Sequence, residues 1–180
     1  MIRKMMMMWV AITWTAVAFA QNLVPLDDSS SVTFVIKNLG INVKGSFTGL
    51  GGTIRFDPAQ PENSVFDVFV DAATVNTGNR KRDEHLQQAD FFDVKNFPHI
   101  KFVSTKVSPG KKAGTFFMEG TLTIKSISLP ISFPFSVEPV AGGYRMEGGF
   151  GTRRKPYGVG RTSTIANKLS VSLQVLALKA

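Results

Sequence analysis

From residue 31 onward, the chain alternates apolar and polar residues in one short run after another. In one run, Leu129, Ile131, Phe133, Phe135 and Val137 alternate with proline, serine and glutamate. A period of two residues is typical of a strand that has one buried face and one exposed face. The pattern predicts strands near residues 31–38, 42–49, 52–57, 65–72, 99–107, 115–125, 128–138, 144–153 and 168–178.

Residues 80–92 depart from this period. Leu86, Ala89 and Phe92 have the spacing of one face of a helix, and Asp83 is placed to favour its N-terminus. The segment also carries Phe91, which makes it more apolar than a simple surface loop. We therefore expect one short helix near residues 80–92, acting as a plug or lid.

Long alternating strands with hairpin links and one helical insertion favour a barrel over a sandwich. The predicted fold class is all-β, an antiparallel barrel of about eight strands with one short helix inserted near residues 80–92. Such a barrel is either filled by its own side chains or holds one small ligand, and the alternation leaves both cases open. Pro130 and Pro134 lie on the polar face of strand 128–138, where they cannot donate to a ladder. That strand is expected at a barrel mouth or seam.

The first 20 residues have the composition of a targeting segment. Arg3 and Lys4 precede an uncharged apolar run, and a small-x-small site ends at Ala20. A transmembrane anchor is the alternative, but the run is short for a span of about 20 residues. We expect a cleaved secretory signal peptide at 1–20, one domain at 21–180, and export to the periplasm.

The charge of the chain limits its partners. Without the first 20 residues, 19 basic and 13 acidic residues remain, a net charge of +6. This balance favours anions. Nucleic acid is not expected for an exported chain, whereas anionic lipid head groups, the membrane surface or an inner-membrane protein fit. A basic surface that serves only solubility is the alternative.

Catalytic and metal chemistry find little support in the sequence. The chain has no cysteine, which removes thiol nucleophiles and thiolate metal sites. His85 and His99 match no zinc spacing, and no Gly-x-Ser-x-Gly elbow is present. We predict no metal, no catalytic residues, no cofactor and no enzymatic activity.

The phenylalanine content points to a binding role. The chain has 15 Phe, and many fall on the presumed inward faces of the strands. These residues either fill an ordinary core or line an apolar tunnel. The candidates for tunnel lining are Phe34, Phe47, Phe91, Phe92, Phe102, Phe116, Leu122, Phe133, Phe135 and Phe150.

Two basic clusters are candidates for the mouth of such a tunnel. Arginine suits phosphate because its planar fork binds two oxygens at once. A solvated basic turn is the alternative for each cluster. The head-group candidates are Arg80, Arg82, His85, Arg153, Arg154 and Tyr157.

Several segments of the chain resemble the YceI-like family. The most specific is residues 77–86 (TGNRKRDEHL), followed by 89–94 (ADFFDV) and the Phe-Pro pair at 97–98. Weaker matches, in the expected order, are 31–40 (SVTFVIKNLG), 45–48 (GSFT), 56–59 (FDPA) and 157–160 (YGVG). The resemblance covers about residues 25–178. It implies a lipocalin-like antiparallel β-barrel that binds polyisoprenoid lipids, usually in the periplasm.

Two segments depart from the family pattern. Residues 153–160 read RRKPYGVG, with Arg153 and Pro156 where relatives often have Asn and an acidic residue. The loop at 125–130 also lacks the usual His-Gly-Val-Thr-Lys-Pro character. These departures predict different head-group chemistry at that end of the barrel.

The resulting hypothesis is an exported protein that holds an isoprenoid lipid in an apolar barrel interior. The lipid would be a polyprenyl phosphate or an isoprenoid quinone, and the role would be transport, storage or envelope stress protection. The alternative is an envelope interaction protein with a closed barrel core, acting through its basic surface.

Overall fold

The computed structural model describes residues 21–161 and 163–180, and in this part of the chain it contains ten strands and one α-helix. The strands are β1 (Gln21–Pro25), β2 (Ser31–Asn38), β3 (Ile41–Phe47), β4 (Gly51–Phe56), β5 (Val65–Asp71), β6 (His99–Pro109), β7 (Thr115–Ile124), β8 (Ile127–Val140), β9 (Gly143–Arg153) and β10 (Ile165–Lys179). The helices are α1 (Arg80–Leu86) and four 3₁₀ turns, η1 (Asp27–Ser29), η2 (Pro61–Asn63), η3 (Ala72–Thr74) and η4 (Lys155–Tyr157). The predicted signal peptide at 1–20 lies outside the described residues.

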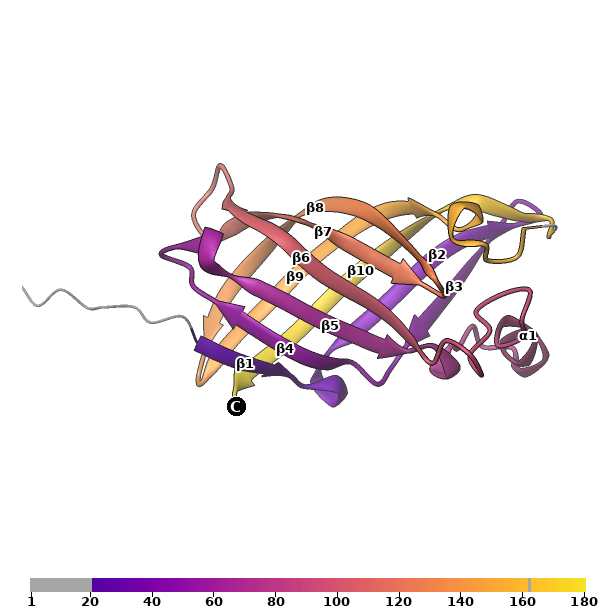
Figure 1. Cartoon of the computed structure of the whole chain (residues 1–180), viewed down its shortest axis with the longest axis horizontal. Helices are drawn as coiled ribbons and strands as arrows, with labels where there is room; N and C mark the ends of the chain where they lie inside the picture. Colours follow the sequence, from indigo (N-terminus) through magenta and orange to yellow (C-terminus); the bar gives the residue numbers. More distant parts are fainter. Residues whose placement is uncertain (1–20, 162) are drawn as a thin grey trace, which may run out of the picture.

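The strands form one antiparallel sheet that closes into a barrel (Figure 1). The closed ring runs β1-β4-β5-β6-β7-β8-β9-β10 and returns to β1, so it contains eight strands. The predicted all-β barrel of about eight strands with one helix is therefore confirmed. Within residues 21–161 and 163–180, no helix is both long and apolar enough to cross a bilayer.

The long strand β10 joins the two ends of the barrel. It pairs with β9 from Lys168 to Leu178, with β2 up to Gln174, and with β1 from Ala177 onward. The short strands β1 and β2 therefore share one long neighbour, and β3 continues the sheet beyond β2. The sequence analysis did not predict β1, because it begins directly after the apolar N-terminal run.

The hydrogen-bond ladder between β8 and its neighbours is complete at one end of the barrel and interrupted at the other. Residues 127–136 of β8 pair with β7, but only residues 135–140 pair with β9. Pro130 and Pro134 lie in the part of β8 without a β9 partner, as their missing N–H groups predicted. Strand β3 also forms an isolated bridge between Ser46 and Asn76, in the segment between η3 and α1.

The predicted helix is shorter than expected. α1 ends at Leu86, and residues 87–98 continue as turns, with Asp93 in the left-handed region at φ 51°. Its N-cap is Asn79, whose side chain accepts a hydrogen bond from the Arg82 N–H at 3.1 Å. Because the helix stops early, Ala89 is exposed and Phe91 is buried instead.

One end of the barrel is filled by its own side chains. Phe56 is fully buried and makes edge-to-face contacts with Phe66, Phe116 and Tyr144, with ring centroids 5.2–6.1 Å apart. The buried members of this closed core are Leu23, Ile54, Phe56, Phe66, Val107, Phe116, Met118, Phe133, Phe135, Met146 and Ala177. The hairpins β6–β7 and β8–β9 lie at this end, the left in Figure 1.

Candidate functional site

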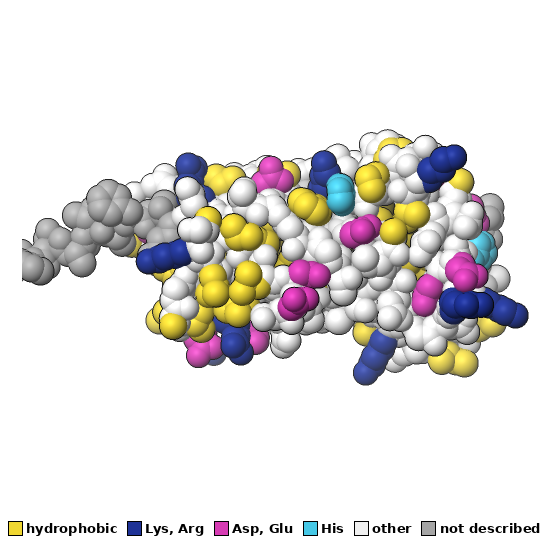
Figure 2. All heavy atoms as spheres, turned by 90° about the horizontal axis from the view of Figure 1, so that it is seen from below, with side chains coloured by type: hydrophobic (Ala, Val, Ile, Leu, Met, Phe, Trp, Pro, Cys, Tyr) yellow, Lys and Arg dark blue, Asp and Glu magenta, His cyan; other side chains and the backbone are white. Residues whose placement is uncertain are grey.

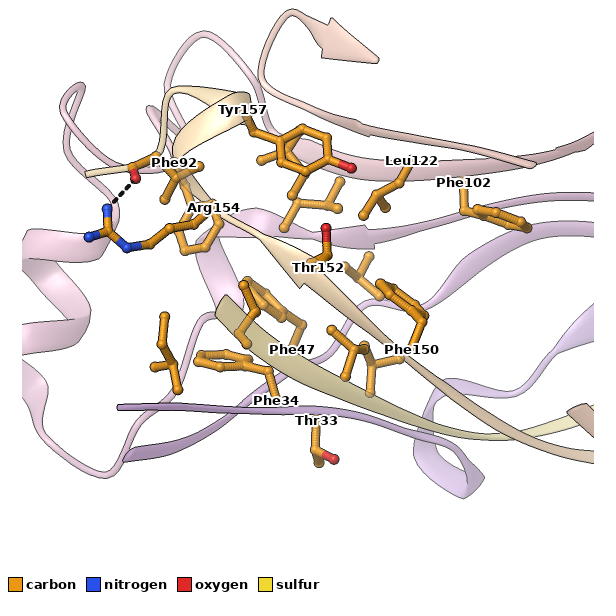
Figure 3. A pocket seen from close by; sticks show the side chains of 18 of the residues that line it. Thr33, Phe34, Phe47, Phe92, Phe102, Leu122, Phe150, Thr152, Arg154 and Tyr157 are labelled. Carbon is orange, nitrogen blue, oxygen red and sulfur yellow. Dashed lines mark hydrogen bonds between the residues drawn. The ribbon is translucent and has the colours of Figure 1, made fainter. Parts of the chain in front are cut away.

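The other end of the barrel contains an apolar cavity. Its volume is about 220 Å³, and it lies between the strands and the segment that carries α1 (Figure 3). Its wall combines inward-facing residues of the strands with Leu86, Phe91 and Phe92 from the α1 segment and Tyr157 from η4. The segment therefore covers one end of the cavity, as expected for a plug.

Aromatic rings form much of the wall. Phe34, Phe47 and Phe92 make a chain of contacts, with ring centroids 5.6 Å and 5.4 Å apart. Phe133 contacts both Phe102 and Phe150 at 5.9 Å and 5.2 Å. Rings in tilted or edge-to-face contact at such distances stabilise one another beyond the area they bury.

Two glycines position these rings. A Cβ at Gly45 would collide with the ring of Phe34, and a Cβ at Gly120 would collide with the ring of Phe102. Each ring lies over a glycine of the neighbouring strand, in space that a larger side chain would occupy. A larger residue at either glycine would displace its ring and change the cavity wall.

The structure places most of the predicted tunnel residues at the cavity, and one of them, Phe133, belongs to the closed core as well. The residues that line the cavity are Phe34, Phe47, Phe91, Phe92, Phe102, Leu122, Phe133 and Phe150. Phe116 and Phe135 are placed differently. They pack against each other in the closed core, with ring centroids 5.6 Å apart. The alternation identified the inward face of each strand but not the end of the barrel that is filled.

Much of the wall is aliphatic and was not named from the sequence. β10 contributes Leu169, Val171, Leu173 and Val175, and β2 and β3 contribute Val32, Ile36 and Val43. The alternation within 168–178 had already placed the four β10 residues on one face. It was the signal that could have identified them.

Arg82 is one of the basic side chains that line the cavity, together with Lys101 and Arg154. Its Nε donates to the Thr77 hydroxyl at 2.6 Å and its Nη2 donates to the Thr77 carbonyl at 2.8 Å. The Thr77 hydroxyl in turn donates to Asp83. These bonds hold the guanidinium in one orientation, and within residues 21–161 and 163–180 its Nη1 has no hydrogen-bond acceptor.

Arg154 also borders the cavity but serves the fold. Its side chain is only 5% exposed, and it donates to the carbonyls of Val159 at 2.7 Å and Ala166 at 2.9 Å. Figure 3 draws one of the bonds that Arg154 makes. Three more bonds reach the carbonyls of Gly160, Ser163 and Ile165.

All five N–H groups of this guanidinium therefore have a backbone acceptor. Desolvation by burial lowers the pKa of Arg154. As a correction to the head-group prediction, Arg154 has no donor left for a ligand, because it organises the loop after β9.

Tyr157 lies beside Arg154 and is almost fully buried. Burial raises the pKa of its hydroxyl above the usual 10.0, and a hydrogen bond with the Thr152 side chain opposes that shift. Its ring lines the cavity, so it contributes mainly apolar wall.

The remaining head-group candidates do not line the cavity. Arg80 is exposed and pairs with Glu84 at 3.4 Å. His85 lies 3.3 Å from Asp90 at the surface, and Arg153 is exposed on β9. On the face shown in Figure 2, Lys and Arg side chains are spread along the barrel, and at the α1 end acidic side chains lie among them. Within the described residues, no group of three or more potential metal ligands occurs.

Comparisons with known proteins agree with this architecture. The family model for the YceI-like domain matches residues 25–177. A UPF0312 protein of Pseudomonas fluorescens is 36% identical over 138 residues, which cover 71% of this chain and 70% of that protein. A UPF0312 protein of Pseudomonas savastanoi pv. phaseolicola is 38% identical over 120 residues, or 63% of this chain. That match spans 62% of the relative, less than two thirds of its length.

Solved structures share the barrel. BcnA of Burkholderia cenocepacia superposes with a TM-score of 0.78 at 23% identity, covering 84% of this chain and 98% of that one. A YceI protein of Campylobacter jejuni has a TM-score of 0.70 at 31% identity, covering 80% and 90%. A polyisoprenoid binding domain from Saccharophagus degradans has a TM-score of 0.69 at 13% identity, covering 89% and 99%. At identities of 23% and 13%, BcnA and the Saccharophagus degradans domain show a shared fold.

Proposed function

Because the chain belongs to the YceI-like domain family, whose model matches residues 25–177, we propose that it binds an isoprenoid lipid inside its barrel. The observation that supports this proposal is the cavity of about 220 Å³ at the α1 end, whose wall is almost entirely apolar. The polyisoprenoid binding domain of Saccharophagus degradans shares the fold. The same fold and an apolar cavity make an isoprenoid tail the best-matched ligand.

The size of the cavity sets the energetic scale of binding. A group the size of one water needs roughly 10–15 Å³ of such volume, and one methylene is of similar size. The cavity of about 220 Å³ therefore holds a hydrocarbon segment on the order of fifteen carbons. Each buried methylene contributes about 0.8 kcal/mol, which gives on the order of 12 kcal/mol before ordering costs. A longer tail would extend through the mouth. Tight binding then needs few polar contacts.

Arg82 is the side chain that we assign to the head group. It borders the cavity, its orientation is fixed by Thr77, and its Nη1 is available to an acceptor. A phosphate would accept a charge-assisted bond from it, and a quinone carbonyl would accept a weaker one. An Arg82→Met variant should lose preference for a phosphorylated tail over an uncharged one while it retains the tail site.

The proposed role of the protein in the cell depends on export. We propose that the segment 1–20 is a cleaved signal peptide and that the protein carries, stores or protects isoprenoid lipids in the periplasm. The alternative of a barrel with a closed core applies only to one half of the molecule, because the α1 end is hollow.

Native mass spectrometry of the protein recovered from a bacterial host, with organic extraction, tests the proposal. A co-purified mass of a polyprenyl compound is the expected result. A Val171→Phe variant adds a ring to the cavity wall and should lower occupancy at least about tenfold, because bound methylenes are displaced.

The matched control is Ser172→Phe, which adds the same ring at the neighbouring, exposed position. It should bind as the unmodified protein does. Equal occupancy in both variants, or a protein that takes up no added isoprenoid, would exclude the barrel as the binding site.

A further inference from the structure

Among the described residues, the two most exposed large apolar side chains lie together at one hairpin tip. Leu39, in the turn that joins β2 to β3, is 79% exposed, and Ile41, the first residue of β3, is 72% exposed. The other exposed large apolar side chains are 37–41% exposed. The tip lies at the same end of the barrel as α1, the right in Figure 1. It therefore lies at the cavity end and not at the closed core.

The backbone of the turn makes Leu39 a costly choice. Leu39 has φ 51° and Gly40 has φ 83°, so both central residues of a two-residue hairpin turn are left-handed. Asn, Asp and Gly are favoured at such positions, and a bulky side chain is strained there. Leu39 contributes neither packing nor good turn geometry. An outlier of this kind points to a role for the side chain outside the fold.

The apolar surface at the tip continues the wall of the cavity. Ile41 is two residues before Val43, and side chains two apart in a strand share a face. Val43 and Phe47 line the cavity, as does Asn38, which pairs with Ile41 across the turn. An apolar path therefore runs from the cavity wall to the tip of the hairpin.

The segments that carry and flank this path on the β2, β9 and β10 side contain basic residues and no acidic ones. Residues 31–50 and 148–180 contain no Asp or Glu. Strand pairing places β10 between β2 and β9, with Ile165 opposite Asn38 and Lys168 opposite Arg153. Apart from Lys179, which pairs with β1 at the opposite end, the exposed basic residues of these segments are Lys37, Lys44, Arg153, Lys155, Arg161 and Lys168. An anionic surface complements this side of the mouth.

We propose that the β2–β3 hairpin tip docks the protein on an anionic lipid bilayer. Leu39 and Ile41 enter the interface between head groups and acyl chains, and the surrounding Lys and Arg contact the acidic head groups. Proteins that bind a membrane surface reversibly often combine apolar side chains that insert with basic residues that contact acidic head groups. Docking in this orientation brings the cavity mouth to the bilayer, and the passage of lipid between the two rests on the proposed function.

Flotation with lipid vesicles tests the docking. The protein is purified in soluble form and its intact mass is measured, so that its N-terminus is known. It should float with vesicles that contain phosphatidylglycerol and remain unbound with pure phosphatidylcholine. A Leu39→Asn, Ile41→Thr variant should lose at least about tenfold in affinity, because the apolar side chains no longer insert. Asn suits the left-handed turn, so this variant should fold.

Matched variants separate apolar insertion and local charge from general effects. Lys37→Glu with Lys44→Glu should weaken binding at least about tenfold, whereas Lys111→Glu with Lys112→Glu, exposed at the opposite end, should change it little. Val65→Thr with Val103→Thr removes exposed apolar groups away from the tip and should bind normally. Equal loss in both lysine pairs would mean that net charge, and not the hairpin, drives binding.

Four further outcomes test the docking proposal and the proposed function. Vesicle binding that survives Leu39→Asn, Ile41→Thr overturns the proposal, as does a protein that binds no anionic vesicle. Self-association by analytical ultracentrifugation that this variant abolishes, without vesicle binding, would assign the tip to a second copy instead. Isoprenoid occupancy is measured in parallel. Docking without any bound isoprenoid would refute the proposed function and leave the docking surface standing.

Discussion

The two ends of the barrel are built from the same alternating strands but are held together differently. At the closed end, Phe56 and its aromatic neighbours interlock and the strand ladder around them is complete. At the cavity end, the β8–β9 ladder stops at Phe135, and α1 and η4 cover the opening. There a smaller buried cluster of Phe91, Leu122, Tyr157 and Val159 lies beside Arg154, which donates bonds to five backbone carbonyls.

This difference shows how one small barrel combines stability with an empty interior. The closed end supplies the buried apolar contacts that a stable fold requires, since burial is the dominant favourable term. The cavity end has fewer buried apolar residues, which leaves space, and hydrogen bonds that do not fill the centre add to the stability of its loops. Substitutions at the two ends should therefore have unequal effects on folding and on binding.

The largest expected contrast comes from truncating one aromatic ring at each end. Phe56→Ala should lower the free energy of unfolding by about 3–5 kcal/mol, because it opens a void in a filled core. Phe47→Ala should cost about 1–2 kcal/mol, because its ring borders a cavity that exists already. Urea unfolding of the delipidated variants measures both. Equal losses would show that the two ends are packed alike.

A smaller contrast comes from adding volume. Val107 is 1% exposed in the closed core, and Val107→Phe should destabilise by about 1–3 kcal/mol through overpacking. Val171→Phe adds the same atoms beside the cavity and should change stability by less than about 0.5 kcal/mol. Thermal unfolding of the two variants compares them. A strongly destabilised Val171→Phe would mean that the cavity does not accept a ring.

The smallest expected effect is a pH dependence at the cavity end. Burial raises the folded-state pKa of Tyr157 above its ordinary value of 10.0. A raised pKa contributes stability that is fully present below the unfolded pKa and is lost as the pH rises through the folded one. The unmodified protein should therefore lose stability above about pH 10 more steeply than Tyr157→Phe does.

The difference between the two unfolding curves isolates this group, because the lysines titrate in both proteins. Parallel curves from pH 8 to 11 would show that the hydroxyl is exposed to solvent in the folded state.

The sequence predicted the strands far better than it predicted the division of the barrel. Period-two alternation is a local property, and it located nine of the ten strands because each carries its own inward face. The filling of the interior depends on contacts between distant strands. Phe116 and Phe102 share a pattern in the sequence, but only the fold places the first in the core and the second at the cavity.

The site residues show a similar limit. Arg82 and Arg154 are both arginines next to the cavity, and no sequence pattern separates one with an available Nη1 from one whose donors are all occupied. The acceptors of Arg154 are backbone carbonyls, which carry no side-chain signature. The exposed Leu39 was also beyond prediction, because the turn at 39–40 places it outside the barrel.

The interrupted β8–β9 ladder has a consequence for how the protein changes over evolutionary time. Since the ladder ends at Phe135 and Gly148, the cavity end can open locally while the closed end stays folded. Under the proposed function, the residence time of a bound lipid is then set by a few residues that contribute little to global stability. Mutations there would adjust the length of lipid that fits and its release rate without placing the rest of the barrel at risk of unfolding.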